Sequence, residues 1–76
     1  MRNEFLKILW MLRFQNMKKK EEEAAWEYQE ILDRCLTDFP REELILESLR
    51  QLVHEERMHE KLADELIQIV YQSRPE

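Results

Sequence analysis

The stretch Thr37-Asp38-Phe39-Pro40 contains the strongest helix stop signal in this chain of 76 residues. Pro40 has no backbone N–H and is tolerated only in the first turn of a helix, and Asp38 can cap the start of a new helix. The residues on both sides are good helix formers, and the chain contains no glycine. We therefore expect two helices, about residues 3–36 and 39–72, joined by a turn at about 37–39.

A short connection between two long helices makes them antiparallel neighbours. The sequence therefore predicts an all-α protein in which residues 1–76 form a single helical hairpin domain. One hairpin of this size buries too little apolar surface to be stable by itself. We expect an oligomer, a bound metal or both.

Composition limits the classes of partner and the compartment. The net charge of -5 argues against nucleic acid, because the one basic cluster, Lys18-Lys19-Lys20, is followed directly by three glutamates. Lys7 and Arg13 interrupt the apolar start of the chain, so we expect neither a signal peptide nor a membrane span, although a peripheral membrane contact stays open. The single cysteine, Cys35, fits a reducing compartment and predicts a cytoplasmic protein.

The second predicted helix has an apolar seam that two polar residues interrupt. Glu56 and His59 form a Glu-x-x-His pair in its middle, where burial of a carboxylate costs several kcal/mol unless a metal ion or another charge compensates it. The seam steps by four and three residues, as the inward face of a packed helix does. Its members are Ile45, Leu49, Leu52, Glu56, His59, Ala63, Leu66 and Val70.

The first predicted helix has a similar seam with one polar member, Glu21. In a hairpin, residues at one level have numbers whose mean falls at the turn, and the mean for Glu21 and Glu56 is 38.5. We therefore expect these two carboxylates at the same height in one core, with His59 one turn further along. The seam consists of Trp10, Phe14, Met17, Glu21, Ala24, Tyr28, Ile31 and Cys35.

Two such hairpins packed about a two-fold axis would form a four-helix bundle with one Glu on two helices and Glu-x-x-His on the other two. This ligand set, with the run Glu21-Glu22-Glu23-Ala24-Ala25-Trp26-Glu27-Tyr28, resembles the ferritin-like di-iron carboxylate superfamily. The length is similar to that of the encapsulated ferritins, which are short two-helix proteins. Those usually carry a C-terminal tail that targets a protein shell, and no such tail is visible after Tyr71.

The resemblance implies a function. Glu21 would be a carboxylate ligand, Glu56 a bridging ligand, His59 a nitrogen ligand and Tyr28 a neighbour of the metal site. The partners would be a second copy of the chain and an encapsulating shell protein, and the site between subunits would hold two iron ions per dimer, or manganese. The implied activity is oxidation of Fe(II), and a rubrerythrin-like peroxide scavenger is the alternative within this family.

The residues by themselves leave other interpretations open. Glu21, Glu56 and His59 could form a buried polar layer that sets the register of a helical oligomerisation module, or a metal site without turnover. Glu23 or Glu55 could replace its neighbour if the register shifts, and His54 falls on the outer face of its helix. An outward stripe of large apolar residues predicts a further interface and an assembly larger than a dimer. That stripe consists of Phe5, Leu12 and Trp26.

Overall fold

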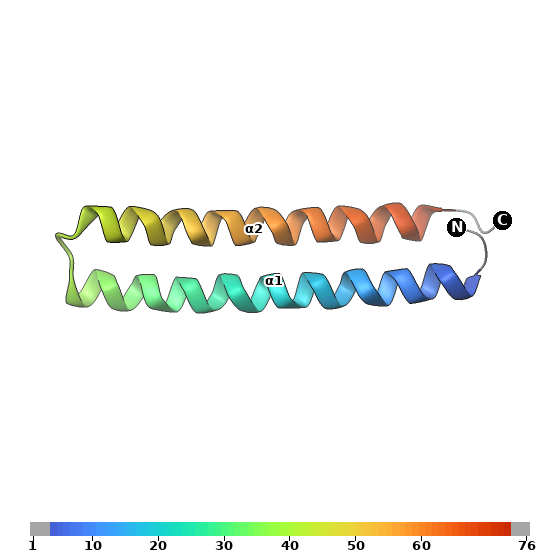
Figure 1. The fold of residues 1–76 in the computed structure, drawn as a ribbon, viewed down its shortest axis with the longest axis horizontal. Helices are drawn as coiled ribbons and strands as arrows, with labels where there is room; N and C mark the ends of the chain where they lie inside the picture. The colour runs from blue at the N-terminus through green and yellow to red at the C-terminus, as the bar shows by residue number, and fades with distance from the viewer. Residues whose placement is uncertain (1–3, 74–76) are drawn as a thin grey trace.

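The computed structural model describes residues 4–73 and consists of two long helices side by side (Figure 1). Helix α1 spans Glu4–Asp38 and helix α2 spans Glu43–Gln72. They form a rod 57 Å long, with the turn at one end and the start of α1 and the end of α2 at the other. The described part of the chain contains no strand, so the expected all-α hairpin is confirmed.

The turn lies later in the chain than the sequence suggested. Helix α1 continues to Asp38, and the amide of Phe39 still donates a hydrogen bond of 2.7 Å to the carbonyl oxygen of Cys35. Pro40 lies in the turn itself and disfavours helical geometry for Phe39. Helix α2 begins at Glu43, so the predicted turn at 37–39, the helix start at 39 and the cap at Asp38 are wrong. Asn3, the expected first helical residue, lies outside the described residues.

Six apolar side chains form the contact between the helices, and two of them are alanines that allow close approach. Ala63 and Val70 of the predicted seam are buried, whereas Ile45 and Leu52 are 47% and 37% exposed. The contact therefore runs along a stripe displaced by about one residue from the predicted seam. We call this stripe the inner stripe; it consists of Ala25, Leu32, Leu46, Ala63, Ile67 and Val70.

Polar contacts across the hairpin keep the helices in register. Lys18 Nζ lies 3.2 Å from Asp64 Oδ1, and this hydrogen bond and ion pair raise the pKa of Lys18 above its ordinary value. At the end that carries the termini, Lys7 Nζ donates a 3.0 Å hydrogen bond to the carbonyl oxygen of Ser73. Lys7 also lies 5.7 Å from the centre of the Tyr71 ring.

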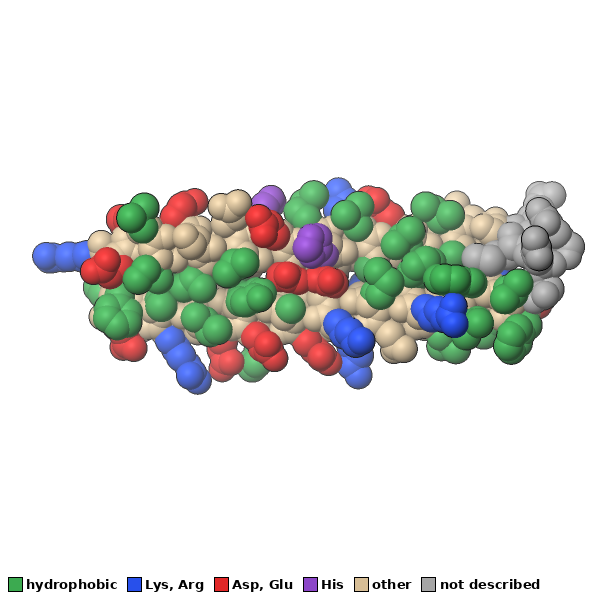
Figure 2. Space-filling view, viewed as in Figure 1, with side chains coloured by type: hydrophobic (Ala, Val, Ile, Leu, Met, Phe, Trp, Pro, Cys, Tyr) green, Lys and Arg blue, Asp and Glu red, His purple; other side chains and the backbone are tan. Residues whose placement is uncertain are grey.

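One broad face of the rod remains apolar and uncovered in the single chain (Figure 2). Its residues lie on the same side of their helix as Glu21 or His59, as their spacing along the sequence shows. They include Leu62, which is 53% exposed. We call this surface the open face. It consists of Trp10, Phe14, Met17, Tyr28, Ile45, Leu52, Leu62 and Leu66.

Neither helix could cross a membrane. Between residues 4 and 73, no helix combines the length and the apolar character that a bilayer crossing requires.

Candidate metal centre

Glu21, Glu56 and His59 meet at mid-length of the hairpin, although they come from two helices. Glu21 is the middle residue of the 35-residue helix α1, and Glu56 and His59 lie on either side of the middle of the 30-residue helix α2. Figure 2 shows a histidine side chain next to acidic side chains near the middle of the rod. Helical spacing explains the pair on α2, because residues three apart lie on the same face one turn from each other.

The three side chains bring their ligand atoms close together. His59 Nδ1 lies 3.4 Å from Glu21 Oε2 and 3.9 Å from Glu56 Oε2. One ligand atom from each residue lies within 4.8 Å of the others. Among the described residues this is the group of acidic and histidine side chains that could hold a metal ion. The sequence had selected these three residues.

The site is half-covered rather than buried in the single chain. The Glu56 side chain is 18% exposed, Glu21 is 30% exposed and His59 is 54% exposed. His59 was expected on the inward seam, and the structure instead directs it to the open face. A hollow beside the group is lined by apolar side chains of both helices, namely Met17, Leu62, Ala63 and Leu66. The ligand atoms therefore lie at the bottom of an apolar surface that a second molecule could cover.

The electrostatics of the group favour a cation. A hydrogen bond with Glu21 raises the pKa of Glu56 above its ordinary value, and burial and the negative charge of Glu21 add to the increase. The proximity of His59 opposes it. Two neighbouring carboxylates repel each other unless a positive charge compensates both. A metal ion at this position would supply that charge.

The observed register explains how Glu56 reaches the group. Residues that face each other across the hairpin have numbers whose mean gives the position of the turn. This mean is 40 for Glu21 and His59, 40 for Lys7 and Ser73, and 41 for Lys18 and Asp64. Glu21 is therefore level with His59 rather than with Glu56, and the expected mean of 38.5 was too low because the turn lies later. Glu56 starts about one turn nearer the loop, and its long side chain covers the difference.

Other candidate residues lie outside the group. Tyr28 is half-buried and follows Glu21 by seven residues, about 10 Å along the helix axis, so its role beside a metal stays a prediction. His54, Glu23 and Glu55 are exposed and do not belong to the group. The sequence analysis did not select the Lys18 and Asp64 pair, although opposite charges whose numbers average close to the turn were a usable signal.

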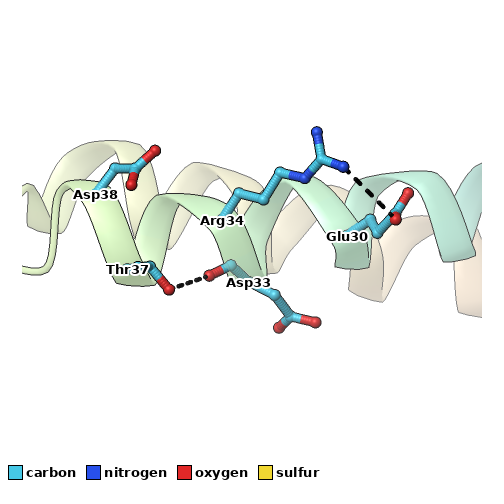
Figure 3. Close-up of a pocket in the computed structure, with 5 residues that line it drawn as sticks. All are labelled: Glu30, Asp33, Arg34, Thr37 and Asp38. Carbon is cyan, nitrogen blue, oxygen red and sulfur yellow. Dashed lines mark hydrogen bonds and ion pairs between the residues drawn. The ribbon is translucent and has the colours of Figure 1, made fainter.

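Two further hollows on α1 carry only local contacts. One lies beside Trp26 and is lined by three glutamates of the same helix. The other lies near the turn, where Figure 3 shows Arg34 paired with Glu30 at 3.9 Å and the Thr37 hydroxyl donating to the Asp33 carbonyl oxygen at 3.3 Å. These contacts join residues one turn apart on an exposed surface, so neither hollow brings ligand atoms of two helices together.

Comparison of the chain with protein-family models, with curated proteins and with solved structures gives no match. The case for a function therefore rests on the residues and the geometry described above.

Proposed function

We propose that two copies of this chain bind two Fe(II) ions between their Glu21, Glu56 and His59 side chains and oxidise them, as a ferritin-like ferroxidase does. One observation carries the proposal. Ligand atoms of two carboxylates and one imidazole lie within 4.8 Å of one another at the centre of an uncovered apolar face. Once a second molecule covers this face, polar groups at its centre are costly unless a charge or a hydrogen bond compensates them.

The geometry of the three side chains fits one metal ion. Two ligand atoms that are each about 2.1 Å from a small divalent cation lie at most about 4.2 Å apart. The distances of 3.4 and 3.9 Å from His59 Nδ1 to the two carboxylates meet this limit. The widest separation, within 4.8 Å, needs only a small side-chain adjustment. Carboxylate oxygen and imidazole nitrogen suit Fe(II) and Mn(II).

A single chain supplies only half of a two-metal site. Ions of this class prefer about six ligands, and three protein ligands leave the remaining positions open. A second copy would bring the total to four carboxylates and two imidazoles, and the four negative charges would balance two divalent ions. Glu56, the less exposed carboxylate, is the better candidate for a bridge between the ions.

The residues have separate tasks in this scheme. Fe(II) is the substrate, and two ferrous ions together can transfer two electrons to one molecule of oxygen or peroxide. Glu21 and Glu56 hold the ions and stabilise the higher charge of the ferric product. His59 supplies an imidazole nitrogen as the third ligand. The apolar residues around the group limit access of water.

A polar layer without metal is the second candidate, and one observation favours it. The contacts of His59 Nδ1 with Glu21 at 3.4 Å and with Glu56 at 3.9 Å give the side chains partners in the absence of an ion. Such a layer would set the register of a helical oligomer. Metal content separates the two candidates.

The first experiment measures metal binding and oxidation. Protein purified without chelators is analysed for metal, and metal-free protein is then titrated anaerobically with Fe(II) before exposure to oxygen. We expect the oxidation amplitude to saturate at two Fe(II) per pair of chains. A rate equal to that of buffer, with no break point, would contradict the ferroxidase proposal. The same measurement with hydrogen peroxide in place of oxygen identifies the oxidant.

Paired substitutions at Glu56 distinguish a ligand from a register residue. Glu56→Ala and Glu56→Leu should both abolish iron binding, whereas Glu56→Leu should leave the metal-free helices at least as stable as in the native protein, because leucine suits a largely buried position. His54→Ala is the matched control for His59→Ala, since both histidines lie on α2 and are exposed. A His54 variant that loses iron while the His59 variant retains it would reverse the assignment.

A further inference from the structure

We propose that the end of the rod opposite the turn docks on a membrane surface that contains anionic lipids. This docking goes beyond metal binding and does not depend on it. It uses a third apolar surface, which we call the tip surface. Its members are between 54% and 72% exposed and belong neither to the inner stripe nor to the open face; they are Phe5, Ile8, Leu12 and Tyr71.

The α1 members of the tip surface lie on the side of the helix away from the open face. They follow one another at steps of three and four residues, so they share one side of α1. Leu12 precedes Glu21 by about two and a half helical turns and therefore lies on the opposite side. Tyr71 joins them from the end of α2, where Lys7 Nζ lies 5.7 Å from the centre of its ring. A second copy on the open face would leave these α1 side chains exposed.

The helix around the tip surface is apolar on every side. Residues 5–14 of α1 comprise eight apolar residues and two basic ones, and residues 66–73 contain no charged residue. Figure 2 shows hydrophobic side chains of both helices toward this end of the rod, with basic side chains beside them. A helix that packs through one side needs only one apolar side. The remaining apolar side chains therefore need a further apolar environment.

The charges around the tip surface favour an anionic partner. From residue 5 to residue 20, α1 carries five basic side chains and no acidic one. Lys18 is bound to Asp64 of α2, whereas Lys19 and Lys20 are exposed. Helices that lie in a membrane interface combine Phe, Leu and Trp with Lys and Arg in this way. The composition of this segment therefore matches a surface of lipid phosphates above acyl chains.

Two of the basic side chains lie over aromatic rings at this end. The guanidinium carbon of Arg13 lies 4.7 Å from the centre of the Trp10 ring, and Lys7 is similarly placed at Tyr71. Trp and Tyr have an apolar body and a polar edge, and Lys and Arg carry their charge on an apolar stem. Such side chains settle where hydrocarbon meets head groups.

Most acidic residues lie away from a membrane at this end. Beyond Leu12 the first acidic residue of α1 is Glu21, about 14 Å further along the axis. Salt screens exposed charges beyond about 10 Å at 0.1 M ionic strength, so the acidic half of α1 repels the lipid weakly. Glu4 and Glu65 lie closer to the tip surface and oppose docking, against the five basic side chains of α1.

A second copy of the chain is the other apolar cover for the tip surface. Two tip surfaces in contact would bring the basic side chains of both copies together, which is unfavourable at low ionic strength. An anionic membrane converts the same charges into an attraction. Charge complementarity therefore favours lipid as the occupant.

Binding to lipid vesicles tests the proposal with the metal-free, full-length chain. We expect the protein to float with vesicles of equal parts phosphatidylglycerol and phosphatidylcholine, and to bind phosphatidylcholine vesicles at least about tenfold more weakly. Binding to the anionic vesicles should fall in 1 M salt. Equal binding to both kinds of vesicle, or binding to neither, would overturn the proposal.

Matched substitutions at the two ends of the rod locate the contact. Phe5→Ser with Leu12→Ser should weaken binding to anionic vesicles about tenfold or more, because both side chains lose their burial in lipid. Phe39→Ser with Leu44→Ser removes the same two side chains near the turn, where they are also exposed, and should leave binding unchanged. Equal losses in the two double variants would overturn the proposal.

Charge removal is tested in the same paired way. Lys19→Gln with Lys20→Gln should weaken binding about tenfold at low ionic strength, because each lysine contributes its attraction to anionic lipid. Arg34→Gln with Arg41→Gln lowers the net charge by the same amount near the turn and should have little effect. A loss at the turn as large as the loss at the lysines would show that net charge alone controls binding.

A single tryptophan reports insertion. Phe5→Trp in a chain with Trp10→Phe and Trp26→Phe should be quenched by phospholipids with brominated acyl chains. Phe39→Trp in the same background should not be quenched, because it lies at the other end of the rod. Quenching at both positions, or at position 39 alone, would contradict docking through the tip surface.

Sedimentation equilibrium without vesicles tests the alternative cover. The variant with Phe5→Ser and Leu12→Ser should keep the molecular mass of the native protein, because the tip surface contacts lipid and not another copy. A variant that dissociates, together with native protein that does not bind anionic vesicles, would show that the tip surface is a contact between copies and would overturn the proposal.

Discussion

The inner stripe and the open face are neighbours on the same two helices, yet they have different surroundings. On α2, Leu46 is 1% exposed whereas Ile45, the preceding residue, is 47% exposed. The two α2 residues of the candidate metal centre differ in the same way, since the Glu56 side chain is 18% exposed and that of His59 is 54% exposed. The inner stripe is completed by the hairpin itself. The open face is also apolar but has larger side chains and no cover, which is the expected state of an interface in a separated subunit.

Substitutions in the inner stripe and substitutions on the open face should therefore have different effects. A change in the inner stripe should act on folding of each chain, independently of protein concentration. A change on the open face should act on association and on the metal centre while the hairpin still forms. The two sets of residues can be tested separately because they alternate along the same helix.

The largest effect on folding is expected at Leu46. Leu46→Ala should lower the free energy of unfolding by about 2–5 kcal/mol, because it leaves a cavity in a contact that has few other members. Leu44→Ala is the control, since this leucine is 87% exposed and its loss should change stability by less than about 0.5 kcal/mol. Urea denaturation at low protein concentration measures both. Equal losses would show that the inner stripe does not hold the hairpin.

The sequence predicted two helices and one turn because the chain lacks glycine and has one strong stop signal. It did not predict which apolar stripe the hairpin would bury. Apolar residues on α2 occupy an arc wider than one helix contact, so steps of three and four residues fit both Ile45 with Leu52 and Leu46 with Ala63. Which of these two stripes is buried depends on how α1 packs against α2. That packing depends on the position of the turn, which the pattern around Pro40 placed too early.

A smaller effect is expected from Leu62, which lies on the open face beside His59. Leu62→Lys should leave the stability of the isolated hairpin nearly unchanged and weaken the dimer about tenfold or more, because each copy loses about 1 kcal/mol of apolar burial. Sedimentation equilibrium measures the association constant. Leu12→Lys is the control, because Leu12 is 54% exposed, close to the 53% of Leu62, and lies on the opposite side of α1 from Glu21. A stronger effect at Leu12 would move the dimer contact to the outer side of the hairpin.

The candidate centre was easier to predict than the packing around it. Glu21, Glu56 and His59 were selected because they interrupt apolar seams, and interruption is visible whether a seam faces inward or outward. The exposure of these three side chains could not be predicted from the sequence. It depends on which stripe the hairpin buries, and that stripe is displaced by about one residue from the predicted seam. The level of Glu56 was also misjudged, but a glutamate side chain is long enough to absorb about one helical turn. The three residues therefore lie together as expected, despite the errors in the predicted core, and their role as metal ligands stays a prediction.

The smallest effect is expected from the ion pair between Lys18 and Asp64, which crosses the contact between the helices. Both side chains are partly exposed, at 33% and 49%, so their coupling should be small. A double-mutant cycle with Lys18→Met and Asp64→Asn, followed by urea denaturation in low and 1 M salt, measures it, and the coupling should fall in high salt. Iron binding should be unchanged in all three variants, because neither residue belongs to the ligand group. A large coupling that resists salt would instead show that this pair is covered in the assembled protein. The hairpin would then have a second interface on that side, and the contrast between one closed contact and one open face would no longer hold.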